Sequence, residues 1–112
     1  MNLGDLITRL EQEDPTRVLT IGFHVPHSYR GYYEELAFEP REDATIATML
    51  SDAQNAVGRI YEGYKGGSYR MHRYTSVWLA YYGCSGIGLS TLLLEYMLGG
   101  DPRTALGMDE LV

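Results

Sequence analysis

The chain has 112 residues, of which 45% are hydrophobic, so it is long enough for one domain with a modest core and too apolar to remain disordered. Its net charge of −6 argues against binding long nucleic acid, because duplex binding uses a broad basic surface. No apolar run of about 20 residues and no signal-peptide pattern is visible, and the single cysteine cannot form an intrachain disulfide, so we expect a cytoplasmic protein that crosses no membrane.

The first predicted element is a helix over residues 3–12, where apolar residues recur at helical spacing: Leu3, Leu6, Ile7 and Leu10. Asn2 is its expected N-cap, and Asp14-Pro15 ends it. Residues 18–23 are rich in strand-forming side chains and predict a strand. We expect Val25-Pro26 to break that strand.

The next segment, HSYRG at residues 27–31, is predicted to be a loop or tight turn. Apolar residues alternate with others over 33–39, which predicts a half-buried strand. Residues 40–43 form a predicted connector, with Asp43 as the N-cap of the following helix. Sustained helical spacing makes 44–60 the clearest helix of the chain.

The second half is rich in glycine. Residues 61–68 are predicted to be a loop, with an extra short strand considered near 68–73, and residues 76–82 alternate as a strand does. The run GCSGIG at 83–88 then leads into a helix over 89–98 that is apolar almost all round. Such a helix is buried on more than one side, so we expect another subunit to cover part of it.

This order of elements, α-β-β-α-β-α, predicts an α+β fold: a small two-layer domain over residues 1–100, followed by a C-terminal tail over 101–112. Strands that follow one another through short turns should pair antiparallel. We therefore expect a mostly antiparallel sheet with about three helices on one face.

Positive charge and tyrosine gather in two loops of this acidic chain. Nine of the ten tyrosines lie between Tyr29 and Tyr82, and the tripeptide Ser-Tyr-Arg occurs twice beside glycine, at 28–30 and 68–70. A tyrosine ring can stack on a nucleobase, and the planar arginine fork matches a phosphate. The pattern favours a small anionic ligand that contains a base. The alternative is that the tyrosines cover core edges and a subunit interface, while the cations are solvated.

The candidate ligand-binding residues follow from this pattern. For phosphate contacts we consider Arg30 together with Lys65, Arg70 and Arg73, and for stacking on adenine Tyr29, Tyr32 and Tyr69. Arg59 is a candidate for a separate phosphate site at a subunit interface. Main-chain N–H groups around Ser85 and Gly86 would bind an anion if the glycine loop leads into a helix start, although a structural turn is the favoured alternative.

Catalytic and metal-binding patterns are weak. His24 and His27 are separated by two residues on a strand-to-loop segment, and His72 is the one further histidine, so we expect no metal site. Cys84 has no companion motif that would make it a nucleophile. No nucleophile, base and orienting group can be named together, so we expect no cofactor and no enzymatic activity.

Several segments together resemble one phage-encoded family over residues 3–98: HSYRGYYEELAFEP, TIATMLSDAQNAVG, YEGYKGGSYRM and VWLAYYGCSGIG. The chain is similar to the Thoeris anti-defence 1 proteins and to small proteins of actinobacteriophage type. Thoeris anti-defence 1 proteins are phage sponges that sequester the cyclic ADP-ribose signal made by bacterial TIR-domain defence enzymes. Some members form oligomers up to hexamers and have additional sites for cyclic oligonucleotides.

The resemblance implies a homo-oligomer, a dimer or a hexamer, that holds a cyclic nucleotide in the host cytoplasm without cleaving it. Among the binding residues it carries over only Arg30, in the matching SYRG loop. Two other functions stay open. The chain could be a protein–protein inhibitor of a host defence factor, because tyrosine and arginine are enriched at binding hot spots, or an enzyme that cleaves a nucleotide with His24, His27 or Cys84.

Overall fold

The computed structural model describes residues 1–31, 34–63 and 66–99. The elements in chain order are α1 (Leu3–Glu11), β1 (Val18–Ser28), the short turn η1 (Tyr29–Gly31), β2 (Leu36–Thr45), α2 (Ile46–Ala56), β3 (Ile60–Glu62), β4 (Ser68–Arg70), β5 (Val77–Leu79), β6 (Ile87–Gly88) and α3 (Thr91–Met97). Residue 33 and the predicted tail over 101–112 lie outside the described residues.

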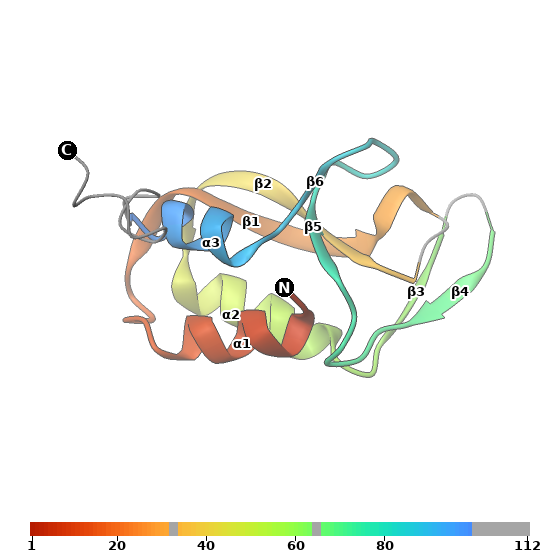
Figure 1. The fold of residues 1–112 in the computed structure, drawn as a ribbon, viewed down its shortest axis with the longest axis horizontal. Coiled ribbons are helices and arrows are strands. Elements are labelled where there is room, and N and C mark those ends of the chain that lie inside the picture. The colour runs from red at the N-terminus through yellow and green to blue at the C-terminus, as the bar shows by residue number, and fades with distance from the viewer. Residues whose placement is uncertain (32–33, 64–65, 100–112) are drawn as a thin grey trace.

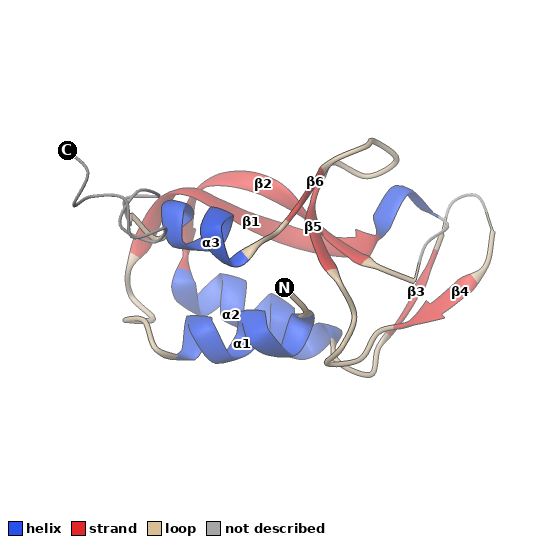
Figure 2. Ribbon diagram, in the orientation of Figure 1, coloured by secondary structure: helices blue, strands red, loops and turns tan. Residues whose placement is uncertain are grey.

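The predicted fold class is confirmed, because the described residues form an α+β domain with three α-helices and a mostly antiparallel sheet. Four strands lie in the order β1-β2-β5-β6, and β3 pairs with β4 in a separate hairpin. The one parallel pair of the larger sheet joins β2 to β5. Helices α1 and α2 cover one face of this sheet (Figures 1 and 2).

Helix α1 begins as predicted. The side chain of Asn2 accepts a hydrogen bond from the backbone N–H of Asp5 at 2.8 Å, and Leu3, Leu6 and Leu10 are buried. The first two helical N–H groups donate to the carbonyls of Thr75 and Arg73. These bonds satisfy donors that a helix start leaves without intrahelical partners, and they fix the turn over residues 72–75 against α1.

The two long strands run past their predicted ends. β1 continues through Val25-Pro26 to Ser28, because the register shifts between His24 and His27 and this β-bulge accommodates the proline. β2 likewise continues through Pro40, which lies opposite Phe23 of β1. β5 pairs only with the part of β2 that precedes Pro40. The predicted connector at 40–43 is therefore wrong.

The start and end of α2 also differ from the prediction. Thr45 caps the helix, accepting a hydrogen bond from the N–H of Thr48, while Asp43 lies inside β2. The helix ends at Ala56, and Gly58 follows with a φ of +79°. A positive φ of this kind suits glycine and stops helical continuation.

The glycine-rich second half contains more strand than its composition predicts. β3 and β4 form a hairpin around the predicted loop at 61–68, and β4 confirms the extra strand considered near 68–73. β5 is shorter than predicted, and β6 pairs with it where a turn was expected. Helix α3 starts at Thr91, with Ser90 as its N-cap.

The core lies between the sheet and helices α1 and α2. The rings of Phe23 and Phe38 pack at its centre, 4.4 Å apart. Within one chain α3 buries only one side, at Leu94 and Met97, and leaves Tyr96 exposed. Among the residues that the structure describes, none buries the second side of this helix as expected. None of the helices in the described ranges is long and apolar enough to cross a membrane.

Candidate ligand-binding site

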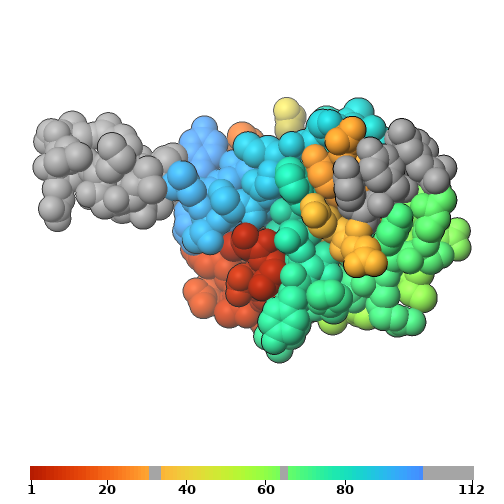
Figure 3. All heavy atoms as spheres, turned by 45° about the vertical axis from the view of Figure 1, so that its right-hand side comes forward, coloured from red at the N-terminus to blue at the C-terminus, as the bar shows by residue number. Residues whose placement is uncertain are grey.

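Three segments that carry predicted ligand-binding residues meet at one end of the molecule, far from α3 (Figure 1). We call this the distal end, defined as residues 27–31, 60–63, 66–70 and 80–86. Figure 3 turns this end toward the viewer, with η1, the β3–β4 hairpin and the β5–β6 loop as neighbours. The N–H of Gly86 donates to the Tyr29 hydroxyl at 3.1 Å, and the Tyr82 hydroxyl donates to the carbonyl of Glu62. The fold therefore gathers both Ser-Tyr-Arg segments at one end.

Tyr29 is a structural residue. Its ring lies parallel to that of Trp78, with centroids 4.2 Å apart and an angle of 8°, and it is only 7% exposed. Together with Ala37 and Ala80 these rings form a small second core. No nucleobase can stack on Tyr29 in this structure, so the ring positions η1 and the β5–β6 loop instead.

Arg30 follows directly on that buried ring and is partly exposed. Its backbone adopts the left-handed region, with a φ of 54° and a ψ of 11°. A residue with a Cβ pays a strain of about 1–3 kcal/mol there, and such strain is enriched at functional sites. Tyr32 and Lys65, two further candidates, lie outside the described residues.

The β3–β4 hairpin divides its side chains between two faces. Tyr61 and Tyr69 are opposite each other, half-buried, and packed against the main core. Ile60 and Arg70 are opposite each other and exposed, and the Arg70 guanidinium donates to the carbonyl of Gly58 at 2.8 Å. Tyr69 can therefore offer only part of its ring to a ligand, whereas Arg70 lies on the outer face.

Arg59 lies over the ring of Tyr61. Its guanidinium carbon is 5.2 Å from the centre of the Tyr61 ring, a cation–π contact. Burial raises the pKa of Tyr61, and Arg59 partly opposes that rise. The Tyr61 hydroxyl is buried without a hydrogen-bond partner among the described residues. The phenol of Tyr61 therefore stays neutral near pH 7, so its contact with Arg59 does not neutralise the positive charge of the guanidinium.

Arg73 lies elsewhere. Its carbonyl accepts from the N–H of Gly4, and its guanidinium lies 5.9 Å from the exposed ring of Tyr74. The side chain lines a cavity of about 280 Å³ together with residues of α1 and with Val57. The structure therefore positions Arg73 at the start of α1 and not at the distal end.

The glycine loop does not lead directly into a helix. β6 separates Ser85 and Gly86 from the start of α3, so the predicted arrangement of an anion-binding helix start is wrong. The N–H of Gly86 is already bonded to Tyr29. A Cβ on Gly86 would lie 2.3 Å from the carbonyl oxygen of Leu79, so glycine is needed for close packing. Ser85 remains exposed at the loop tip.

Tyr81 and Tyr82 are exposed aromatic rings that the sequence analysis did not select. They are 59% and 41% exposed at the distal end. The N–H of Tyr82 donates to the Glu39 carboxylate, and its ring meets that of His27 edge-on, 4.7 Å away. Their alternation with Val77 and Leu79 suggested strand residues. β5 ends at Leu79, so both rings lie in the loop that follows it.

His27 is also structural. It is 7% exposed, and its two ring nitrogens lie 3.1 Å and 3.2 Å from the carbonyl oxygens of Ser28 and Ala80. Cys84 is exposed. Across the described ranges no group of three or more histidine, cysteine or acidic side chains is arranged to hold a metal ion.

The distal end therefore combines exposed tyrosines, Arg30 and Arg70 on a scaffold of buried rings. A scan of protein-family models and searches of curated proteins and of solved structures give no match to this chain.

Proposed function

We propose that the protein binds a small cyclic nucleotide at the distal end and sequesters it without cleaving it. One observation carries the proposal: the two Ser-Tyr-Arg segments, 40 positions apart in the sequence, lie at the same end of the fold. Arg30 and Arg70 would contact phosphate there. Tyr81 and Tyr82 would replace Tyr29 as the rings that stack on a base.

The chemistry of these residues suits a ligand of the cyclic ADP-ribose class, which the family resemblance implies. Such a ligand has an adenine to stack and a diphosphate to neutralise. A stacked base contributes about 1–3 kcal/mol, and a hydrogen bond to a charged group about 1.5–3 kcal/mol. Nanomolar binding needs about −12 kcal/mol, so several of these contacts must act together.

Binding without cleavage is supported by the burial of one of the three candidate catalytic groups, His27. His27 is buried with both ring nitrogens close to carbonyl oxygens, which leaves it poorly placed to accept a proton from a substrate. We also propose a location in the host cytoplasm, in keeping with the one exposed cysteine, Cys84.

The test is to incubate the purified protein with cyclic ADP-ribose isomers and, separately, with cyclic oligonucleotides. Protein is removed by filtration, free ligand is assayed, and the retained protein is heat-denatured and assayed again. The proposal predicts that one ligand is depleted and then released intact. Release of an altered product would indicate an enzyme, and it would contradict the proposal.

A second candidate function is direct inhibition of a host defence protein. It is favoured by the exposure of Tyr81 and Tyr82, because exposed tyrosines are enriched at protein-binding hot spots. It predicts no ligand depletion in the same assay. It also predicts a stable complex with a host factor that Tyr82→Ala weakens.

A further inference from the structure

The turn between β4 and β5 exposes side chains that the proposed function does not use. It comprises residues 72–75, and we call it the 72–75 turn. His72, Arg73 and Tyr74 are exposed, whereas Thr75 is buried. Tyr74 is 73% exposed, the largest value among the large hydrophobic side chains of the described residues. Tyrosine and arginine are the residue types that most often dominate binding at protein interfaces, so their exposure side by side indicates a surface that binds a partner.

Hydrogen bonds fix the backbone of the 72–75 turn. Two backbone N–H groups at the start of α1 donate to the carbonyls of Arg73 and Thr75, each at 2.8 Å. Within the turn, the N–H of Thr75 donates to the carbonyl of His72, and the Thr75 hydroxyl accepts from the N–H of His72, both at 2.9 Å. The N–H of Tyr74 donates to Nδ1 of His72 at 3.2 Å. A turn held in this way loses little conformational freedom when its exposed side chains bind a partner.

Gly4 of α1 makes room for the side chain of Arg73. A Cβ on Gly4 would lie 3.2 Å from the Cβ of Arg73 and 3.4 Å from its Nε, so the arginine packs along the first turn of the helix. Its guanidinium carbon is 5.9 Å from the centre of the Tyr74 ring, a cation–π contact. No Asp or Glu side chain of the described residues forms an ion pair with Arg73. The guanidinium is therefore held in place while its charge remains available to a partner.

A cavity of about 280 Å³ lies beside Arg73. It is lined by Gly4, Ile7, Thr8, Glu11, Val57 and Arg73. Ile7 is half-buried and Val57 is 44% exposed, so these two side chains give the cavity an apolar part. The Thr8 hydroxyl already donates to the carbonyl of Gly4 at 3.0 Å. The cavity thus presents a cation, an apolar surface and, at Glu11, an exposed carboxylate.

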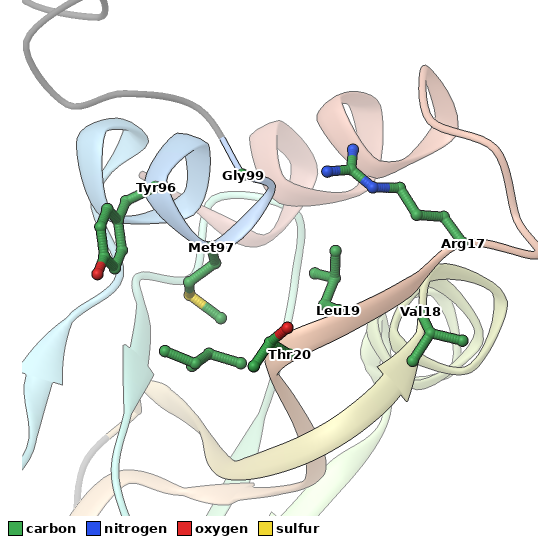
Figure 4. A pocket seen from close by; sticks show the side chains of 8 residues that line it. Arg17, Val18, Leu19, Thr20, Tyr96, Met97 and Gly99 are labelled. Carbon is green, nitrogen blue, oxygen red and sulfur yellow. The ribbon is translucent and has the colours of Figure 1, made fainter.

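The cavity between α3 and the beginning of β1 has a different character (Figure 4). It measures about 400 Å³ and is lined by residues 17–21 with Tyr96, Met97 and Gly99. Its charged lining residue, Arg17, is 3.0 Å from the carboxylate of Glu13 and also donates to the carbonyl of Leu98. The charge of Arg17 is thus already compensated within the chain. The cavity beside Arg73 differs because its cation is available, and that charge specifies the chemistry of an occupant.

From these observations we propose that the 72–75 turn and the cavity beside it bind an acidic segment of another protein. One carboxylate of the segment pairs with Arg73, because the planar guanidinium matches a carboxylate with two parallel hydrogen bonds. A neighbouring apolar side chain enters the cavity between Ile7 and Val57, and the ring of Tyr74 covers its rim. Glu11 repels a second negative charge in the same cavity, so a nucleic acid, with a phosphate at every nucleotide, fits less well.

This surface is separate from the proposed ligand site. Arg73 lies at the start of α1, outside the distal end, and the second candidate function uses Tyr81 and Tyr82 instead. The proposal therefore does not rest on capture of a nucleotide. Either can fail without the other.

The test is fluorescence anisotropy of the full chain with a short labelled peptide of alternating glutamate and leucine. The proposal predicts saturable binding that Arg73→Ala and Tyr74→Ala each weaken by about tenfold, as truncation of a hot-spot residue does. Arg41→Ala is the matched control, because it removes the same charge from an exposed arginine of β2, and it should leave the affinity unchanged. Circular dichroism checks that each variant folds.

Two further probes separate an acidic protein segment from other anions. A peptide of alternating glutamate and glycine carries the same charge without apolar side chains, and an oligothymidylate of equal charge stands for nucleic acid. Both should bind at least tenfold more weakly than the glutamate–leucine peptide. The proposal is overturned if the glutamate–leucine peptide does not bind, or if Arg73→Ala binds it as tightly as Arg41→Ala does. Equal binding of either further probe would also overturn it, because charge alone would then explain the association.

Discussion

The helix-covered core and the distal end are built on different principles. The core uses apolar side chains at regular spacing, such as Phe23 and Phe38, neither of which has a positive φ. The distal end uses rings, glycines and left-handed backbone, at Arg30, Gly66, Gly67 and Gly83. The core therefore supplies the stability that holds the strained loops in place, and mutations in the two regions should lower the stability by very different amounts.

The largest expected effect is in the core. Phe23→Ala removes a fully buried ring and should lower the free energy of unfolding by about 3–5 kcal/mol. Tyr82→Ala at the distal end removes a ring that is 41% exposed and should cost about 1 kcal/mol or less. Urea denaturation of both variants measures the difference. Equal losses would mean that the distal end is as tightly packed as the core.

The next effect tests how closely the β5–β6 loop packs on the sheet. Gly86→Ala should cost about 1–3 kcal/mol, because its Cβ would lie 2.3 Å from the Leu79 carbonyl oxygen. Gly88→Ala is the matched control, since its Cβ would meet only the Trp78 ring at 4.0 Å. Thermal denaturation should separate the two clearly. A Gly86→Ala variant as stable as Gly88→Ala would contradict the close approach that positions Tyr29.

A smaller effect concerns strain at Arg30. Arg30→Gly and Arg30→Ala both remove the side chain, but only glycine adopts a φ of 54° without strain. The glycine variant should therefore be more stable by about 1 kcal/mol. Both variants should lose ligand depletion equally. If the alanine variant were the more stable of the two, the left-handed conformation would not be the one that the chain adopts.

The smallest effect is a pH dependence in the pair that ties α3 to α1. The hydrogen bond from Arg9 is the main cause that lowers the pKa of Glu95 below its usual value. A carboxylate of this kind stabilises the fold above its unfolded pKa, and the contribution is lost as the pH falls through the folded value. Glu95→Gln should cost about 0.5–1 kcal/mol at pH 7.

The same difference should shrink as the pH falls below about 4. Glu11→Gln, an exposed change on α1, is the control and should show no such trend. Denaturation at several pH values provides the measurement. If the difference in the free energy of unfolding between Glu95→Gln and the unaltered chain were the same at all pH values, the ion pair between Arg9 and Glu95 would not be the cause of that difference.

Sequence reasoning predicted the fold class and α1 because both follow from local signals, the spacing of leucines and the cap at Asn2. It failed at Pro26 and Pro40, where a bulge and an unpaired strand edge admit residues that usually end a strand. The candidate site rests on the repeated Ser-Tyr-Arg tripeptide and on the local gathering of tyrosine and positive charge. Burial of Tyr29 against Trp78 depends on residues 49 positions apart, and no local pattern reveals it.

The most direct measurement of the central claim is ligand depletion by four forms of the full chain: unaltered, Arg30→Ala with Arg70→Ala, Arg73→Ala, and Arg41→Ala as an exposed cation away from the distal end. The account predicts intact capture by the unaltered chain, by Arg73→Ala and by Arg41→Ala, and a loss of at least tenfold in affinity for the double variant. Unchanged capture by the double variant, or no capture by any form, would contradict it.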